Sequence, residues 1–190
     1  YKDRVKLLSY PVQELGGLIF AYLGPAPVPL LPRWDLLVWD NVERSIQVAD
    51  LPCNWLQCME NSLDPVHNEW LHGRYGEWVL ASVGKPSDHL VLQRDRHRRI
   101  GFDRFEYGMI KRRLYDTDDD NAEGWRIGHP ILFPNILRQG RSGRSISFQF
   151  RVPVDDEHTS HVTYSVRMPK LGEVAPAQDV VPWSTQEVYD

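Results

Sequence analysis

Two histidines and an aspartate near the middle of the chain are the side chains best suited to chemistry. Asn61, Asp64 and His67 recur at every third position, and His72 follows five residues after His67. Imidazole nitrogens bind iron, zinc, copper and nickel, and two of them with one carboxylate form the site of mononuclear ferrous oxygenases. The pattern indicates a metal centre at His67 and His72, with Asp64 orienting His67 as a hydrogen-bond acceptor rather than binding the metal. Spacing alone equally allows two histidines that simply end a helix at the surface.

The spacing of the two histidines sets a condition on the backbone. Five residues turn about 140° around an ideal α-helix, so His67 and His72 would diverge on a regular helix. They converge only if the helix is bent or loosely wound between them, and the break at Pro65 makes such a geometry plausible.

The elements around this stretch follow from local signals. The sequence predicts a helix over 54–63, with Asp50 as a possible cap, and a short helical piece over 66–72. Short runs between glycines or prolines, or with period two, predict strands elsewhere. These strands are expected at 4–11, 17–23, 45–49, 88–113, 125–138, 144–153 and 160–168. Many antiparallel strands with few helices predict an α+β fold with a curved sheet around a helix.

The run at 61–72, Asn-Ser-Leu-Asp-Pro-Val-His-Asn-Glu-Trp-Leu-His, resembles the iron-binding motif of the alpha (large) subunits of Rieske-type aromatic ring-hydroxylating oxygenases. The phthalate-dioxygenase-like branch, built from alpha subunits only, is the most similar. Further stretches resemble the same family, and together they cover most of the chain. They are residues 10–25, 31–35, 54–60 and 129–135.

The resemblance implies a helix-grip-like catalytic domain that holds a mononuclear Fe(II) at His67 and His72. It implies that Asp64 bridges electron transfer from a Rieske [2Fe–2S] cluster of the neighbouring subunit, and that Asn61 lies near the iron. The implied reaction uses O₂ and two electrons to hydroxylate an aromatic substrate, by mono- or dioxygenation. A reductase or ferredoxin would supply the electrons, and the full-length protein would be a homotrimer. Pocket walls are expected from Met59, Ile131, Leu132 and Phe133.

The resemblance also implies a division of the chain. Residues 1–25 would end a Rieske domain, 26–44 would connect, and 45–190 would form an incomplete catalytic domain. Cys53 and Cys58 do not form the Cys-x-His and Cys-x-x-His pairs of the cluster, so its ligands are expected before Tyr1. The third iron ligand is expected just beyond Asp190, with Asp190 and Asp179 as candidates within the chain. This stretch alone is therefore expected to be inactive.

Composition excludes several classes of protein. The net charge of −4 argues against a nucleic-acid binder held by phosphate contacts. The apolar runs are too short for a membrane span. Two cysteines cannot supply a disulfide framework and fit a reducing, cytoplasmic setting.

Two other functions remain open from the residues. One is a helix-grip module that binds an apolar ligand without catalysis, in which the histidines are incidental. The other is a zinc hydrolase, although Glu69 does not have the spacing of the His-Glu-x-x-His helix.

Overall fold

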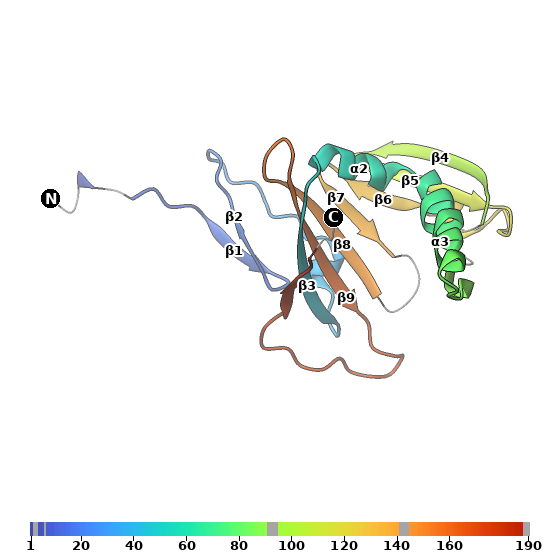
Figure 1. Ribbon diagram of the computed structural model, residues 1–190. Helices are drawn as coiled ribbons and strands as arrows, with labels where there is room; N and C mark the ends of the chain where they lie inside the picture. Colours follow the sequence, from blue (N-terminus) through green and yellow to red (C-terminus); the bar gives the residue numbers. More distant parts are fainter. Residues whose placement is uncertain (2–3, 6, 91–94, 141–144, 188–190) are drawn as a thin grey trace.

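One large curved sheet forms the body of the protein (Figure 1). The computed structural model describes residues 1, 4–5, 7–90, 95–140 and 145–187. The sheet has eight strands in the order β10-β3-β9-β8-β7-β6-β5-β4. All neighbouring strands are antiparallel except β10 and β3, which are parallel. A separate hairpin, β1–β2, precedes the sheet in the chain.

The strands of the large sheet are β3 (Glu43–Leu51), β4 (His97–Phe105), β5 (Gly108–Tyr115), β6 (His129–Leu132), β7 (Ile136–Gln139), β8 (Ser145–Pro153), β9 (Thr159–Arg167) and β10 (Trp183–Thr185). The hairpin consists of β1 (Val12–Leu15) and β2 (Leu18–Ala21). The helices are α1 (Asp35–Val38), α2 (Trp55–Leu63), the π-helix η2 (Asn68–Tyr75), α3 (Gly76–Ser82), the 3₁₀ turn η3 (Asp88–Leu90) and α5 (Glu123–Arg126). The expected α+β class is confirmed.

Strand periodicity gives the sheet two chemically different faces. Successive side chains of a strand point to opposite faces. In β8, Ile146 and Phe148 belong to the main apolar core, whereas Gln149 and Arg151 lie on the other face and line a polar cavity. The same alternation continues into β7, where Leu137 faces the cavity and Ile136 faces the core.

The main core lies between the sheet and the first part of the chain. Leu36 and Leu37 of α1 pack there against Phe148 and Tyr164, and Leu15 of the hairpin joins them. The hairpin turns at Gly16 and Gly17, which both have positive φ, the conformation that a two-residue turn of this kind requires. Tyr164 Oη donates a hydrogen bond of 2.7 Å to the carbonyl of Gly16, which fixes the turn to the sheet.

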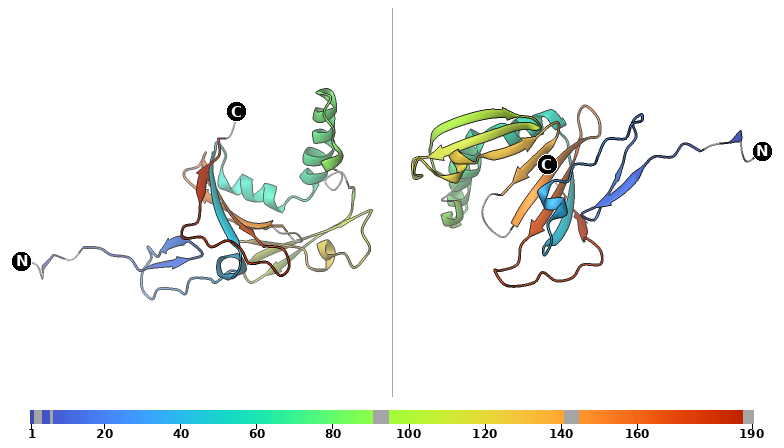
Figure 2. Two further views of the ribbon diagram at one scale, coloured as in Figure 1. Left: turned by 90° about the horizontal axis from the view of Figure 1, so that it is seen from below. Right: turned by 180° about the vertical axis from the view of Figure 1, so that it is seen from behind.

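Helix α2 covers the opposite face, over β7 and β8 (Figure 2). Met59 packs there with Ile131 and Leu137 in a small apolar cluster. Figure 2 also shows that the helix containing α3 stands away from the sheet. The end of α2 and the start of the next helix therefore lie over the polar part of this face.

Several boundaries differ from the sequence-based expectations. Asp50 does not cap α2, because β3 stays paired with β9 as far as Leu51; Asn54 is the cap instead. Of the two strands expected near the start, one lies later than 4–11, at Val12–Leu15. The strand expected at 88–113 begins with the 3₁₀ turn η3, and the strand expected at 125–138 begins within the helix α5. Residues 91–94 lie outside the described residues. The division of the chain at residues 25 and 44 stays a prediction.

Among the residues that the structure describes, no helix combines the length and the apolar character needed to cross a lipid bilayer.

The Tyr164 hydrogen bond gives a test of how the hairpin is held. Tyr164 is fully buried, so Tyr164→Phe leaves the Gly16 carbonyl without its donor and should lower the free energy of unfolding by about 1 kcal/mol. Urea denaturation of the full-length protein measures the change. Tyr10→Phe, at a tyrosine that is 42% exposed, should have no effect. Equal stability of the two variants would show that the bond does not hold the hairpin.

Candidate functional site

Asp64 ends α2 and starts the next helical segment. Its backbone is extended, as expected for a residue before proline. Its carboxylate accepts hydrogen bonds from the backbone N–H groups of Val66 (2.8 Å) and His67 (3.0 Å). Asp64 therefore acts as the N-terminal cap of the segment that carries both histidines.

The helix that follows is loosely wound between the two histidines. His67 lies directly before the π-helix η2, and His72 lies within it. In a π-helix the backbone hydrogen bonds join residues five apart, so five residues make roughly one full turn. In an α-helix the same five residues make about 1.4 turns, which would point the two side chains in different directions. The two imidazole rings accordingly lie 5.3 Å apart between centroids, at 73° to each other. Of the two conditions under which the histidines could converge, a bent or a loosely wound helix, the structure shows the second.

His67 is held in a state suited to metal binding. Burial lowers the pKa of His67, and the neighbouring His72 and Lys111 lower it further, while the charge of Asp64 partly offsets these effects. Its Nδ1 lies 3.4 Å from Asp64 Oδ2 and is buried without a hydrogen-bond partner. A neutral imidazole with a carboxylate beside Nδ1 leaves Nε2 as the ligand atom.

The carboxylate of Asp64 stays ionised. Burial acts to raise its pKa, but the two backbone N–H groups and His67 outweigh it, so the pKa of the Asp64 carboxyl lies below its usual range. The side chain is 45% exposed. One edge of the carboxylate is thus committed to the cap and His67, and the rest remains accessible.

Both histidines line a cavity of about 270 Å³ between the helices and the sheet. Its wall is polar and basic. Six of its side chains are cationic or imidazole groups, namely His67, His72, Lys111, Arg113, His129 and Arg151. Asn61, the third residue expected near the metal, also lines the cavity and is exposed. The sheet residues of this wall come from β5, β6, β7 and β8.

The residues expected as apolar pocket walls lie elsewhere. Met59 and Ile131 are buried in the cluster beneath α2, and Leu132 is buried in the main core. Phe133 is 52% exposed. Leu137 is the apolar side chain of the cavity wall. The difference arises because α2 seals the apolar part of this face, which leaves its polar part open.

Glu69 anchors the π-helix to the sheet. The side chain is buried, and its carboxylate accepts bonds from the backbone N–H and ring Nδ1 of His97, both at 3.0 Å. Arg74 lies 3.3 Å away on the other oxygen. Burial acts to raise the pKa of Glu69, but these donors outweigh it and keep the pKa below the usual range. A carboxylate committed in this way is not free to serve as the general base of a zinc hydrolase.

The structure brings two possible metal ligands together, His67 and His72, and no third ligand joins them among the described residues. Within the described residues, no group of three or more His, Cys, Asp and Glu side chains could hold a metal ion. Asp190 lies outside the described residues. Cys53 and Cys58 are free thiols. The histidine pair thus fits two positions of an iron site, and the chemistry of its nitrogens suits ferrous iron.

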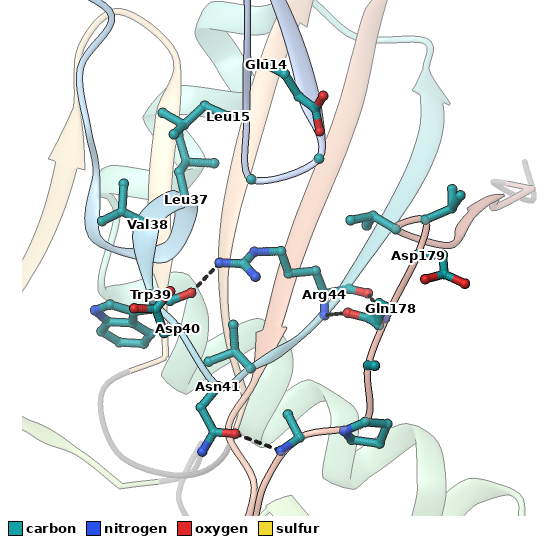
Figure 3. A pocket seen from close by; sticks show the side chains of 18 of the residues that line it. Glu14, Leu15, Leu37, Val38, Trp39, Asp40, Asn41, Arg44, Gln178 and Asp179 are labelled. Carbon is teal, nitrogen blue, oxygen red and sulfur yellow. Dashed lines mark hydrogen bonds between the residues drawn. The ribbon is translucent and has the colours of Figure 1, made fainter.

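Asp179 lines a different cavity of about 920 Å³ (Figure 3). This cavity lies beside the hairpin turn and α1, on the face of the sheet opposite the histidines. Gln178 there bonds the backbone N–H and carbonyl of Arg44, so it continues the pairing of the C-terminal segment with β3. The Arg44 guanidinium donates to the Trp39 carbonyl at 2.5 Å. The structure therefore does not bring Asp179 together with His67 and His72.

Lys111, Arg151 and Glu69 were not found by sequence reasoning. Each is buried although its type is usually exposed. A signal existed for Glu69, which lies between the two histidines. Arg151 alternates with the apolar Phe150 and Val152, and Lys111 begins a run of three basic residues, and both patterns are typical of solvent-facing side chains.

Comparison with known proteins gives relatives along nearly the whole chain. The 5,5'-dehydrodivanillate O-demethylase oxygenase subunit of Sphingobium sp. (strain NBRC 103272 / SYK-6) is 36% identical over 184 residues, covering 96% of this chain and 41% of that protein. The phthalate 4,5-dioxygenase oxygenase subunit of Pseudomonas putida is 32% identical over 173 residues, covering 83% and 37%. The chain thus spans about two fifths of the length of these relatives. No family model matches.

Solved structures share the fold. The oxygenase–ferredoxin complex of carbazole 1,9a-dioxygenase, in its reduced form, matches with a TM-score of 0.51 at 20% identity, covering 93% of this chain and 49% of that chain. The terminal oxygenase of carbazole 1,9a-dioxygenase from Novosphingobium sp. KA1 matches with a TM-score of 0.50 at 18% identity, covering 84% of this chain and 48% of that chain.

The Glu69 anchor can be tested by removing its charge. Glu69→Gln weakens the bonds from His97 and Arg74 and should lower the free energy of unfolding by about 2 kcal/mol, since hydrogen bonds to charged groups are the stronger ones. Urea denaturation of the full-length protein measures it, with the exposed Glu60→Gln as the matched control. If both variants are as stable as the wild type, Glu69 is not an anchor.

Proposed function

This chain is homologous to part of the oxygenase subunits of Rieske-type ring-hydroxylating oxygenases, and on that premise we propose that it is the iron-binding portion of such an enzyme. The proposed reaction is the hydroxylation of an aromatic substrate with O₂ and two electrons. The electrons come from a Rieske cluster whose ligands lie outside this chain. The observation that carries the proposal is the π-helix that places His67 and His72 together at the edge of a cavity.

The residues of the site have separate roles in this reaction. His67 and His72 are two iron ligands, and a third, carboxylate ligand comes from beyond the described residues. When bound, ferrous iron supplies the capacity to activate O₂. Asn61 lies beside it on the cavity wall. The cavity orients the substrate next to the histidines.

Asp64 is proposed as the bridge for electrons. Its backbone contacts and its position beside His67 Nδ1 support this role, because they fix one edge of the carboxylate. The exposed part can accept a hydrogen bond from a cluster ligand of a neighbouring subunit, in a homotrimer. A ferredoxin or reductase is proposed as the donor; the solved structures with this fold include complexes with a ferredoxin.

Iron content tests the ligand assignment. His67→Ala should remove the mononuclear iron from the full-length protein, while the visible absorption of the Rieske cluster reports that the protein is intact. His158→Ala is the matched control, because His158 also lies beside an aspartate three residues before it but at an exposed turn. Elemental analysis measures the iron. Full retention in His67→Ala contradicts the assignment and favours the binding module without a metal.

The variant Asp64→Asn tests the role of Asp64 in electron transfer separately from iron binding. The amide oxygen can keep one capping bond, so iron should be retained, but the loss of charge should slow turnover by about tenfold or more, the scale seen for partners of metal ligands. Single-turnover kinetics of the reduced enzyme measures it. Asp155→Asn is the control, since Asp155 makes the same local bonds, to the N–H groups two and three residues on. Wild-type turnover in Asp64→Asn refutes the bridge.

A further inference from the structure

Two cysteine thiols lie together at the start of α2. Asn54 caps this helix with its side chain, so Cys53 precedes the cap and Cys58 is the fourth residue of the helix. Side chains at these two positions pack against each other in the hydrophobic staple that often opens a helix. The Cys53 thiol lies over the first helical turn, where it donates to Gln57 Oε1 at 3.4 Å. The thiols of Cys53 and Cys58 are also within hydrogen-bond reach of each other. The staple of α2 is therefore a pair of thiols.

The turn that carries the pair is fixed to the sheet. Thr159, which is fully buried at the start of β9, donates to the carbonyl of Cys53 at 2.6 Å. The Asn54 amide donates to the carbonyl of Asp156 at 2.8 Å, in the turn between β8 and β9. Further along the helix, Met59 packs in the apolar cluster beneath α2. These contacts hold the backbone on both sides of the pair, so the two thiols stay close together.

The surroundings of the pair distinguish the two thiols. Burial raises the pKa of the Cys58 thiol, and the charge and the hydrogen bond of Cys53 raise it further, while Arg151 and Thr159 partly offset these effects. A thiol reacts with an oxidant as its thiolate, so these surroundings slow the reaction of Cys58. Both cysteines are only partly buried, which leaves the pair accessible to a small oxidant. Cys53 is therefore the thiol that reacts first.

We propose that Cys53 and Cys58 form a reversible disulfide at the start of α2, with hydrogen peroxide as the oxidant. Cys53 attacks the peroxide, the O–O bond breaks, and Cys53 becomes a sulfenic acid with release of one water. The Cys58 sulfur then displaces the hydroxyl group from Cys53, and the S–S bond forms with release of a second water. The two sulfurs lose two electrons, the two peroxide oxygens gain them, and both thiol protons end on water.

The proposed oxygenase reaction gives this oxidant a local source. Two-electron reduction of O₂ yields hydrogen peroxide when the electrons do not reach a substrate. The source of the peroxide rests on the proposed function, whereas the disulfide itself rests only on the geometry of the pair.

Peptide mass spectrometry tests the disulfide directly. The full-length protein is treated with hydrogen peroxide and denatured, and its remaining thiols are blocked with N-ethylmaleimide. Trypsin then releases both cysteines in one peptide, 45–74, because neither Lys nor Arg lies between Arg44 and Arg74. This peptide should carry no maleimide and weigh two hydrogen atoms less than the reduced peptide, and dithiothreitol should restore two maleimide sites. Two maleimides after peroxide treatment would overturn the proposal.

Met59, in the same peptide, is an internal control for the fold. Its side chain is 2% exposed, so it should gain no oxygen while the disulfide forms. A disulfide found only in peptides with oxidised Met59 would mean that it forms in the unfolded chain, and would overturn the staple geometry.

Two serine variants test the order of the reaction. In Cys58→Ser, oxidation should stop at the sulfenic acid of Cys53, which dimedone traps. In the matched variant Cys53→Ser, Cys58 should keep its maleimide site at the same peroxide concentration, because burial disfavours its thiolate. Dimedone labelling of Cys58 rather than Cys53 would overturn the assigned order.

The variant His67→Ala separates this inference from the proposed function. Added peroxide needs no iron, so the disulfide should form in His67→Ala as it does in the wild type. Loss of iron in this variant with no disulfide in either protein overturns only the disulfide. A disulfide in both proteins with full iron retention in His67→Ala contradicts only the proposed function.

Discussion

The site depends on the wide helical turn between His67 and Tyr75. A regular α-helix would place His67 and His72 on diverging directions, whereas the π-helix brings their rings to 5.3 Å. Such a turn is rare in proteins, and contacts from outside the helix hold it here. Asp64 supplies one at the start of the segment through two backbone N–H groups. Glu69 supplies another inside the turn, by holding His97.

The register of β4 against β5 shifts between His97 and Arg99, so the strand is irregular where Glu69 reaches it. An irregular strand end can turn both a backbone N–H and a ring nitrogen toward the same carboxylate. The wide helical turn and the irregular strand end therefore compensate each other: each leaves polar groups that the other satisfies.

The sequence predicted the helical segment that carries the two histidines better than it predicted the tertiary contacts around that segment. The Asp-x-x-His pattern occurs twice, at Asp64–His67 and Asp155–His158, with the same capping bonds. What distinguishes the first pair is a second histidine five residues on and a break at Pro65, and both are visible in the sequence. The helical segment was predicted from these signals, and loose winding was recognised as the condition under which the two histidines converge. The cap at Asn54 was not, because the length of β3 is set by its pairing with β9.

The basic floor of the cavity could not be predicted, because burial of charge depends on tertiary structure. Lys111 lies in the run Lys-Arg-Arg, which is typical of a solvent-exposed strand. Arg112 does fit that expectation in part, since it pairs with Asp103 away from the site. Lys111 lies on the other face, and α2 covers it.

The charge of the cavity links the two halves of the site. Its described wall contains three cations and three imidazoles and no carboxylate. Metal binding would add positive charge to a wall that already lacks negative charge, so the two imidazoles alone make an electrostatically unfavourable site. Asp64 offsets this positive charge only in part, because its carboxylate is partly exposed. A carboxylate ligand to the metal would reduce this excess of positive charge, which is the electrostatic reason why the histidine pair needs a carboxylate partner.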